Sequence, residues 1–449
     1  MKHLFSRLSP AQKIILSFLL VIFCGSLLLS LPWVQTASSQ ASYLDHLFTA
    51  VSMVCVTGLF TRSVVDTYNV WGQLLCMLLI QIGGLGILTF IGFFTMESRK
   101  KLSLKDRRIL RDSFSYGHNR TLGQFVRSIF ITTFSIEGLG ALLLMIRFIP
   151  KFGLRKGIFN SIFLAVSAFC NAGFDNFGND SLLGLQTDVL VNITLALLII
   201  TGGLGFMVWF DLATKLGGKQ KGLHFHTKVV LLLTAGLLVF GTVTSLWTEY
   251  NNPGTIGNLS FGDKLLVSFF QTVSMRTAGF ASIDYTAARP VTLFIYLLQM
   301  FLGGAPGGTA GGLKITTFLV LLLFARKEIL GLPHTNMGRR TLSPQLVQKA
   351  FGVTVIFQLT FLLGLLALGL VTDSSHRFIY LIFETVSALA TVGVTANITT
   401  SLNTAGMIVI MLLMFIGRVG PLTLMVSLNH YQPKKAATLH YSKADIMIG

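Results

Sequence analysis

The amino-acid sequence predicts an all-α membrane protein with eight transmembrane helices and four shorter, re-entrant half-helices. Two observations lead to this prediction: a composition suited to the lipid bilayer, and a short motif that occurs four times at nearly equal spacing. Of the 449 residues, 52% are hydrophobic and only 12% are charged, whereas a soluble domain carries about 25% charged residues. Because its charged fraction is only half that of a soluble domain, the chain is predicted to lie in a membrane.

Eight apolar runs have about the 20 residues that a helix needs to cross the hydrocarbon core. They cover residues 14–32, 72–96, 126–146, 189–210, 229–247, 291–325, 350–370 and 405–426. Lys2, Arg7 and Lys13 precede the first run, as basic residues precede the apolar part of a signal peptide. No small-residue cleavage site follows Pro32, so this run is predicted to be a transmembrane helix as well.

A motif that ends in glycine divides the chain into quarters. Its copies occupy residues 51–59, 166–174, 273–280 and 386–394. The closing glycines are 115, 106 and 114 residues apart: Gly58, Gly173, Gly279 and Gly393. A second glycine cluster follows them after 25, 29, 24 and 24 residues, at Gly83-Gly84, Gly202-Gly203, Gly303-Gly304 and Gly417. Two features that recur at one offset in four places are the signature of an internal repeat.

An apolar segment that is too short to span the membrane leads into each motif. In the first quarter it covers about residues 43–54, and twelve helical residues rise only about 18 Å. The chain must therefore enter the membrane and turn back, and matching half-helices are predicted at about 157–168, 262–273 and 377–388. The result is four span–pore-helix–span repeats around one pore: residues 1–110 with Gly58, 111–225 with Gly173, 226–340 with Gly279, and 341–449 with Gly393 and the C-terminal tail.

The closing glycines suit a site for a monovalent cation. Irregular backbone at membrane depth is tolerated only where it is buried in protein or lines a water-filled cavity. Glycine permits angles that turn carbonyl oxygens toward an axis, and four such loops would form a ring that replaces the hydration shell of the ion. The negative C-terminal ends of the half-helices would favour cations. Close helix packing is the alternative for a single Gly-Gly pair, but the fourfold repetition favours the pore.

The basic residues indicate the orientation of the chain. The net charge is +18, and Lys and Arg crowd the N-terminus, the loops 99–111, 215–228 and 326–349, and the tail 434–443. The positive-inside rule places these segments and both termini in the cytoplasm. An outer cluster is the local exception: Arg147, Lys151, Arg155 and Lys156. Charges in short loops beside spans favour anionic lipid or a cytosolic partner over nucleic acid.

With this motif, the chain resembles the membrane subunits of the Trk/Ktr/HKT superfamily of potassium transporters, and most of all a bacterial Ktr-type ion-translocating subunit. Thr391-Val392-Gly393 also resembles the start of the potassium-channel signature Thr-Val-Gly. The resemblance implies a selectivity filter that binds K⁺ through Val56, Thr57, Gly58, Asn171, Ala172, Gly173, Thr277, Ala278, Gly279, Thr391, Val392 and Gly393. Because glycine closes all four loops, it also implies a preference for K⁺ over Na⁺.

Residues 303–312, which we call the glycine-rich loop, interrupt the sixth apolar run with six glycines and one proline. A glycine costs about 1 kcal/mol and a proline about 3 kcal/mol inside a helix, so this span is predicted to be broken into two helices. In the family that the chain resembles, the matching loop lies under the filter and acts as the gate. The implied gate residues are Gly303, Gly304, Pro306, Gly307, Gly308, Thr309, Gly311, Gly312 and Arg418. A packing hinge away from the pore is the alternative.

Arg418 lies in the middle of the last span. An arginine there costs about 2.5–3.5 kcal/mol by insertion scales, so it should face the bundle interior or water. The family carries an arginine at this place, which implies that Arg418 holds the loop and obstructs the pathway when closed. A buried ion pair with Glu137, also in mid-span, is the alternative. Lys314 is predicted either at the cytoplasmic mouth or snorkelling to the interface.

The expected function is K⁺ uptake across the plasma membrane through a gated pore, without covalent chemistry. A sodium- or proton-coupled secondary transporter is the alternative, although such proteins favour inverted repeats and only Glu137 could serve as a midplane coupling carboxylate. The chain has no Walker loop and no HExxH motif, so no enzyme and no cofactor are expected. K⁺ is the expected substrate, and Na⁺ is a stimulating ion to be tested.

The expected partners come from the resemblance. It implies a homodimer that docks on a cytosolic ring of nucleotide-binding regulatory subunits, because this chain carries no GxGxxG-bearing domain of its own. The basic loops 99–111, 215–228 and 326–349 are candidates for that docking and equally for membrane lipid. The segment after Tyr441 is expected to contribute to dimer contacts.

Overall fold

A computed structural model describes residues 10–86, 122–178, 181–218, 220, 222–338, 340–372 and 377–420. The basic loop 99–111, the tail 434–443 and the segment after Tyr441 lie outside these residues, as do the last parts of the predicted spans 72–96 and 405–426. Within the described ranges the regular secondary structure is helical except for one hairpin, in which β1 (Asn336–Met337) pairs antiparallel with β2 (Arg340–Thr341).

The helices follow one pattern in each quarter. The first quarter contains α2 (Pro10–Leu29), α3 (Tyr43–Cys55), α4 (Val64–Thr67) and α5 (Val70–Leu85), and the second contains α8 (Leu122–Phe152), α9 (Leu154–Phe169), α10 (Val189–Gly203) and α11 (Phe206–Leu216). The third contains α12 (Phe225–Glu249), α13 (Phe261–Ser274), α14 (Pro290–Phe301) and α15 (Ile315–Ile329). The fourth contains α16 (Pro344–Val371), α17 (Phe378–Leu389) and α18 (Thr404–Val419), and short 3₁₀ turns occur at η1 (Pro32–Val34), η2 (Leu183–Leu185) and η3 (Thr399–Ser401).

Helices lie at all four positions predicted for half-helices, namely α3, α9, α13 and α17, with ends within three residues of the expected ones. Local chemistry explains two of their beginnings. Ser42 accepts a hydrogen bond from the backbone N–H of Asp45, whose carboxylate binds back to Ser42, and Ser260 caps α13 through Asp263 in a similar way. The first is a capping box, which satisfies two free N–H groups of the first turn, whereas Ser260 satisfies only the N–H of Asp263.

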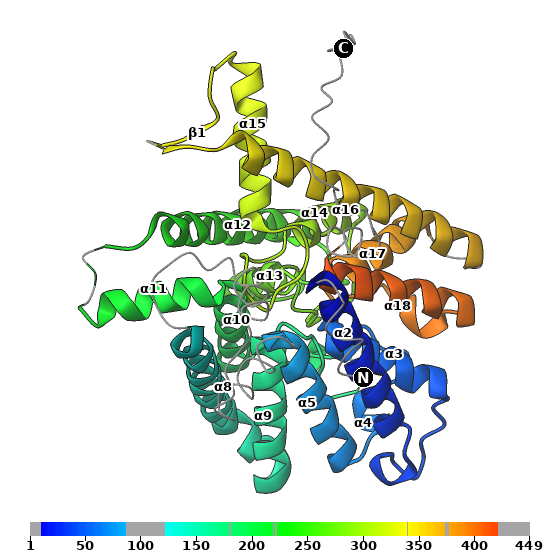
Figure 1. The fold of residues 1–449 in the computed structure, drawn as a ribbon. Helices are drawn as coiled ribbons and strands as arrows, with labels where there is room; N and C mark the ends of the chain where they lie inside the picture. The colour runs from blue at the N-terminus through cyan, green and yellow to red at the C-terminus, as the bar shows by residue number, and fades with distance from the viewer. Residues whose placement is uncertain are drawn as a thin grey trace, which may run out of the picture.

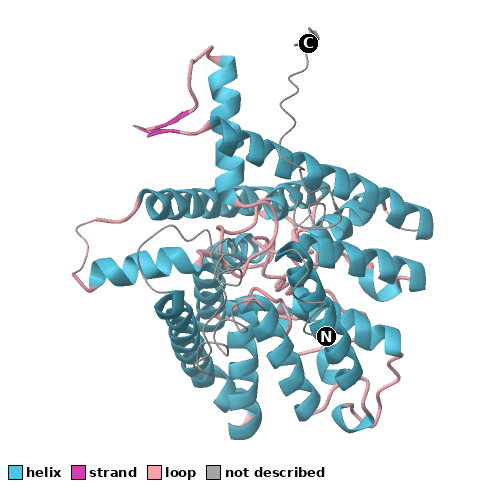
Figure 2. Ribbon diagram, viewed as in Figure 1, coloured by secondary structure: helices cyan, strands magenta, loops and turns pink. Residues whose placement is uncertain are grey.

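The quarters are arranged around a common centre in their sequence order (Figure 1). At every boundary between neighbouring quarters, the helix after one motif packs on the half-helix of the next quarter: α5 packs on α9, α10 on α13, α14 on α17, and α18 on α3. The last pair closes the ring. Figure 2 shows that loop segments gather at this centre, between the helices.

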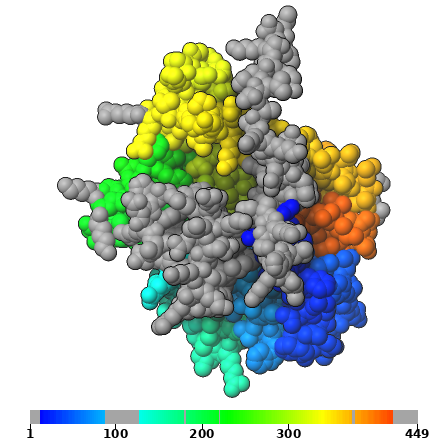
Figure 3. Space-filling model, in the orientation of Figure 1, coloured from blue at the N-terminus to red at the C-terminus, as the bar shows by residue number. Residues whose placement is uncertain are grey.

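By length and apolar composition, four described helices can cross a membrane alone, namely α2, α8, α12 and α16. The count is five if α10 and α11 form one bent span. The other apolar helices, α5, α14, α17 and α18, are shorter. As predicted, the glycine-rich loop breaks the sixth apolar run, and helix resumes at Ile315. Beyond the break, α15 and the β-hairpin form the projection at the top of Figures 1 and 3.

The predicted span 189–210 is not one straight helix. The structure divides it into α10 and α11, which meet at an angle of 97°. Gly205 between them has φ of +89°, a left-handed conformation that glycine adopts without strain. The backbone N–H of Phe206, at the start of α11, donates to the carbonyl of Gly307 at 3.0 Å. A bond to the glycine-rich loop thus stabilises the bend.

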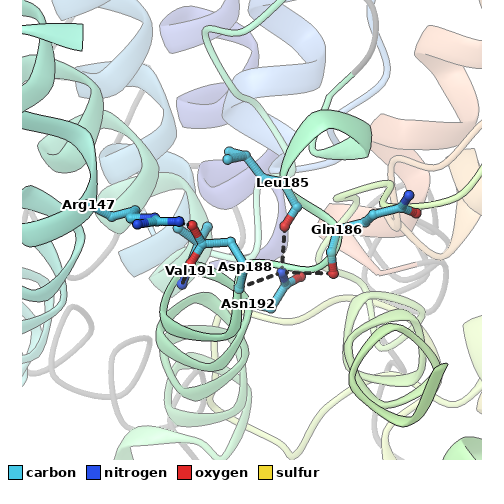
Figure 4. A network of polar contacts seen from close by, with 6 residues as sticks. All are labelled: Arg147, Leu185, Gln186, Asp188, Val191 and Asn192. Carbon is cyan, nitrogen blue, oxygen red and sulfur yellow. Dashed lines mark hydrogen bonds and ion pairs between the residues drawn. The ribbon is translucent and has the colours of Figure 1, made fainter. Parts of the chain in front are cut away.

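The beginning of α10 is fixed by a polar network (Figure 4). Asp188 accepts a hydrogen bond from the backbone N–H of Val191 and forms an ion pair with Arg147 of α8. Asn192 is buried, and its amide nitrogen lies 2.8 Å from the carbonyl of Leu185 and 2.9 Å from that of Asp188. The first turn of α10 is therefore held by two interactions: a buried one through the Asn192 amide and an exposed one through the Arg147–Asp188 ion pair.

We expect Asn192→Ala to destabilise the protein by about 1–3 kcal/mol, because buried carbonyls lose their donor. Arg147→Gln is the matched control and should cost at most about 1 kcal/mol, since the Arg147 side chain is 60% exposed and surface ion pairs contribute little. Thermal unfolding of the purified protein in detergent measures both. A larger loss from Arg147→Gln would contradict this assignment.

Candidate ion pathway

The residues that close the motif copies, 56–58, 171–173, 277–279 and 391–393, are called motif loops one to four. The structure brings all four together. A Cβ placed on Gly58 would lie 3.2 Å from the Cα atoms of both Gly173 and Gly393, and one placed on Gly173 would lie 2.7 Å from the Cα of Gly279. The closing glycines therefore touch one another in the order of the quarters, with no room for a side chain between them.

Each motif loop contains two residues with positive φ. The closing glycine is one, and the other lies two residues earlier: Val56 at 55°, Asn171 at 58°, Thr277 at 69° and Thr391 at 50°. For β-branched residues this conformation is strained, by about 1–3 kcal/mol at each position. The glycines of the sequence did not predict these positive φ angles, because the local conformational preferences of valine and threonine disfavour them. Such strain persists only where the surrounding structure enforces it.

Hydrogen bonds to a recurring serine orient the carbonyl groups of the motif loops. In loop one, the N–H of Thr57 donates to the Ser52 carbonyl at 2.8 Å and the N–H of Gly58 donates to Ser52 Oγ at 3.1 Å. A trans peptide carries its carbonyl opposite to its N–H, so the carbonyls of Val56 and Thr57 point away from the half-helix. Ser387 binds loop four in the same way.

Loops two and three vary this arrangement. Ser167 accepts the N–H of Ala172 on its carbonyl and the N–H of Phe174 on Oγ. Ser274 accepts the N–H of Ala278, but its hydroxyl donates to the carbonyl of Phe280. The serine stands six residues before the closing glycine in three quarters and five before it in the third. Its recurrence was visible in the sequence and could have identified these positioning residues.

A second set of side chains ties each half-helix to the segment that follows its motif loop. The pairs are Asp45–Thr61 at 2.7 Å, Asn160–Asn176 at 2.7 Å, Gln271–Ser282 at 2.7 Å and Glu384–Thr395 at 2.6 Å. Glu384 also accepts a hydrogen bond from Thr399, so it binds the segment after the motif loop of its own quarter. All four half-helix members of these pairs are buried, and every motif loop is consequently held on both sides.

The glycine-rich loop lies against motif loop two and the end of α10. The N–H of Ala305 donates to the carbonyl of Gly203 at 2.9 Å, and the N–H of Thr309 donates to that of Gly202 at 3.1 Å. Thr309 Oγ1 donates to the carbonyl of Phe169, just before motif loop two, at 3.0 Å. The predicted gate residues therefore lie beside the predicted filter.

Arg418 binds the glycine-rich loop through its guanidinium. Nη1 donates to the carbonyl of Thr309 at 2.6 Å, and Nη2 donates to the carbonyls of Gly83 and Gly84 in α5. The structure does not pair Arg418 with Glu137, whose carboxylate accepts a hydrogen bond from Gln81 Nε2 at 3.1 Å. One cation thus connects the loop to α5.

Lys314 is the second cation at this loop. Its Nζ donates to the carbonyl of Ala310 at 2.7 Å. Of the two predicted placements, this contact does not match a side chain that snorkels to the interface. Lys314 instead holds the end of the loop near the start of α15.

These features define a class of protein: a multi-pass helical membrane protein in which loops from four quarters of one chain meet at a common centre. The chain belongs to the TrkH family of cation transport proteins, whose family model matches residues 7–438. This membership agrees with the predicted superfamily.

Two relatives match over nearly their whole length. The chain is 39% identical to the Ktr system potassium uptake protein B of Bacillus subtilis, over 99% of this chain and 97% of that protein. It is also 39% identical to the potassium/sodium uptake protein NtpJ of Enterococcus hirae, over 100% of this chain and 99% of that protein. The crystal structure of the potassium transporter TrkH from Vibrio parahaemolyticus shares the fold, with a TM-score of 0.74 and 18% identity over 93% of this chain and 84% of that one.

Proposed function

We propose that this chain takes up K⁺ across the cell membrane through a gated, K⁺-selective pathway whose filter is formed by the four motif loops. The observation that carries the proposal is their meeting at one centre, with carbonyls directed away from the half-helices. Rings of backbone carbonyls replace the hydration shell of K⁺. The hydroxyls of Thr57 and Thr391 are buried and lack a hydrogen-bond partner in the described ranges, so an ion there would also satisfy them.

The gate in this proposal is the glycine-rich loop with Arg418. The loop lies beside the motif loops, and the guanidinium fixes one of its carbonyls. Eight spans would complete the pathway: α2, α5, α8, α10, α12, α14, α16 and α18. Basic residues in the last turn of α15, Arg326 and Lys327, favour cytoplasmic termini by the positive-inside rule.

Regulation and assembly are part of the same proposal. A homodimer bound to a cytosolic nucleotide-binding ring is the arrangement that the family resemblance implies, with membrane lipid around it and K⁺ as substrate. The name of the Enterococcus hirae relative includes sodium, which makes Na⁺ the first ion to test as stimulator or competitor.

A coupled carrier is the second candidate, and one observation favours it. Glu137 is a buried mid-span carboxylate close to motif loop two, since Gln81 binds Glu137 and lies 3.6 Å from the sulfur of Cys170. Intramembrane carboxylates often serve proton or ion coupling. In this reading, K⁺ uptake would require a sodium or proton gradient.

The proposal predicts that this chain restores the growth, in low K⁺, of cells that lack their own K⁺ uptake systems, with K⁺ entering in preference to Na⁺. Gly279→Ser should lower the K⁺/Na⁺ uptake ratio, because a Cβ there would lie 2.6 Å from the carbonyl of Val392 and 2.9 Å from the Cα of Gly173. Uptake is measured by ion content with and without sodium and proton gradients. Strict dependence on either gradient, or on Glu137, would favour the coupled carrier.

A further inference from the structure

The glycine-rich loop contacts the strained residues of the motif loops. Thr309 Oγ1 lies 3.1 Å from the Asn171 side chain. Because this hydroxyl donates its one proton to the carbonyl of Phe169, the Asn171 amide is oriented so that its nitrogen donates to Oγ1. The N–H of Gly311 donates to Thr277 Oγ1 at 3.0 Å. Gly311 also packs against Thr391, since a Cβ on that glycine would lie 1.9 Å from Thr391 Oγ1. Three of the four non-glycine residues with positive φ in the motif loops therefore touch one loop.

Val56, the fourth strained residue, is connected to the glycine-rich loop through Arg418. The guanidinium binds the carbonyls of Thr309 and Gly83. Gly83 in turn packs behind motif loop one, because a Cβ placed on it would lie 2.8 Å from Val56 Cγ2. The glycine-rich loop and the four motif loops thus form one continuous network of contacts.

A strained backbone needs partners to hold it. Each left-handed valine, threonine or asparagine costs about 1–3 kcal/mol unless its surroundings enforce the conformation. Serine bonds hold the motif loops from the side of the half-helices, and the glycine-rich loop supplies contacts to the strained side chains themselves. A loop that moved to open a passage would remove those contacts.

We propose that the glycine-rich loop supports the filter as well as closing the pathway, so that opening the gate relaxes Asn171, Thr277 and Thr391 and weakens discrimination between K⁺ and Na⁺. This inference rests on the proposed function. Coupling between two sites is reciprocal. An ion that stabilises the strained filter therefore also stabilises the closed loop, and a change in the filter alters the gate.

Thr309→Val tests this coupling in the full chain. Valine keeps the shape of the side chain but removes the hydroxyl that binds Asn171 and the carbonyl of Phe169, and the backbone bond from Arg418 to Thr309 remains possible. We expect the K⁺/Na⁺ uptake ratio to fall about five-fold or more, the lower end of typical allosteric coupling. Thr309→Ser, which keeps the hydroxyl, should restore most of the ratio.

The control is Thr316→Val in α15, whose hydroxyl makes no hydrogen bond within the described residues and which should behave as wild type. The reverse arm is Thr277→Val, a filter change that should raise basal K⁺ flux through the gate in proteoliposomes without a regulator. If Thr309→Val does not reach the membrane, the basal flux of Thr277→Val still tests the coupling between filter and gate.

The outcomes separate the two proposals. Wild-type protein that takes up no K⁺ would refute the proposed function itself. If wild type transports K⁺ and Thr309→Val changes the flux with an unchanged K⁺/Na⁺ ratio, the loop is a plug independent of the filter and the coupling is wrong. Unchanged basal flux in Thr277→Val would also overturn it.

Discussion

Gly393→Ala is expected to lower K⁺ uptake at least ten-fold. Gly393 has φ of +96°, and a Cβ there would lie 2.0 Å from the carbonyl oxygen of Thr57 and 2.9 Å from the Cα of Gly58. Both atoms belong to backbone, so motif loops one and four would have to separate. Left-handed backbone alone costs an alanine about 1–2 kcal/mol, and 1.4 kcal/mol corresponds to a factor of ten. Ion uptake by cells without other K⁺ systems provides the measurement.

Gly236→Ala in α12 is the matched control, because a Cβ there meets nothing within 4 Å. Alanine in a helix interior is more stable than glycine by about 1 kcal/mol, so this variant should transport normally. Wild-type uptake and ion preference in Gly393→Ala would show that the ions do not pass between motif loops one and four.

Arg418→Gln is expected to raise K⁺ flux about ten-fold or more in proteoliposomes that contain this chain without a regulator. The guanidinium bonds the carbonyl of Thr309 on one side and those of Gly83 and Gly84 on the other. Hydrogen bonds to a charged group contribute about 1.5–3 kcal/mol each, and the loss of one is enough to shift the gate by that factor. Flux is followed by uptake of a radioactive K⁺ substitute.

Arg418→Lys should give an intermediate flux, since an ammonium is a point charge and lacks the planar fork that bridges the two sides. Arg155→Gln, an exposed cation at the start of α9, controls for the loss of a positive charge. Unchanged or reduced flux in Arg418→Gln would mean that Arg418 does not hold the pathway closed.

The half-helices could be predicted from the sequence because their evidence is local. Length ruled out a complete crossing, and a polar cap such as Ser42 before an apolar run marks a helix start. The bend at Gly205 could not be predicted in this way. It depends on the bond from Phe206 to Gly307, which joins two quarters, and an uninterrupted apolar run favours one straight helix.

In the candidate site, too, local sequence features could be predicted, whereas tertiary contacts could not. Fourfold repetition identified the closing glycines, and the cost of a buried charge placed Arg418 in the interior. The partner of Arg418 could not be identified, because backbone carbonyls leave no trace in a sequence, whereas Glu137 does. The left-handed conformation at Val56 and Thr391 opposes local propensity, so only tertiary contacts could establish it.

The shorter third motif has a consequence for symmetry. In a pore built from four identical chains, the loss of one residue between Ser274 and Gly279 would occur in every wall of the ring. In the proposed pathway one polypeptide would supply all four walls, and the loss occurs once. The ring therefore has no true fourfold axis, and each wall can diverge without altering the other three. Single substitutions in this chain change one side of the ring at a time, a resolution that a homotetramer does not offer.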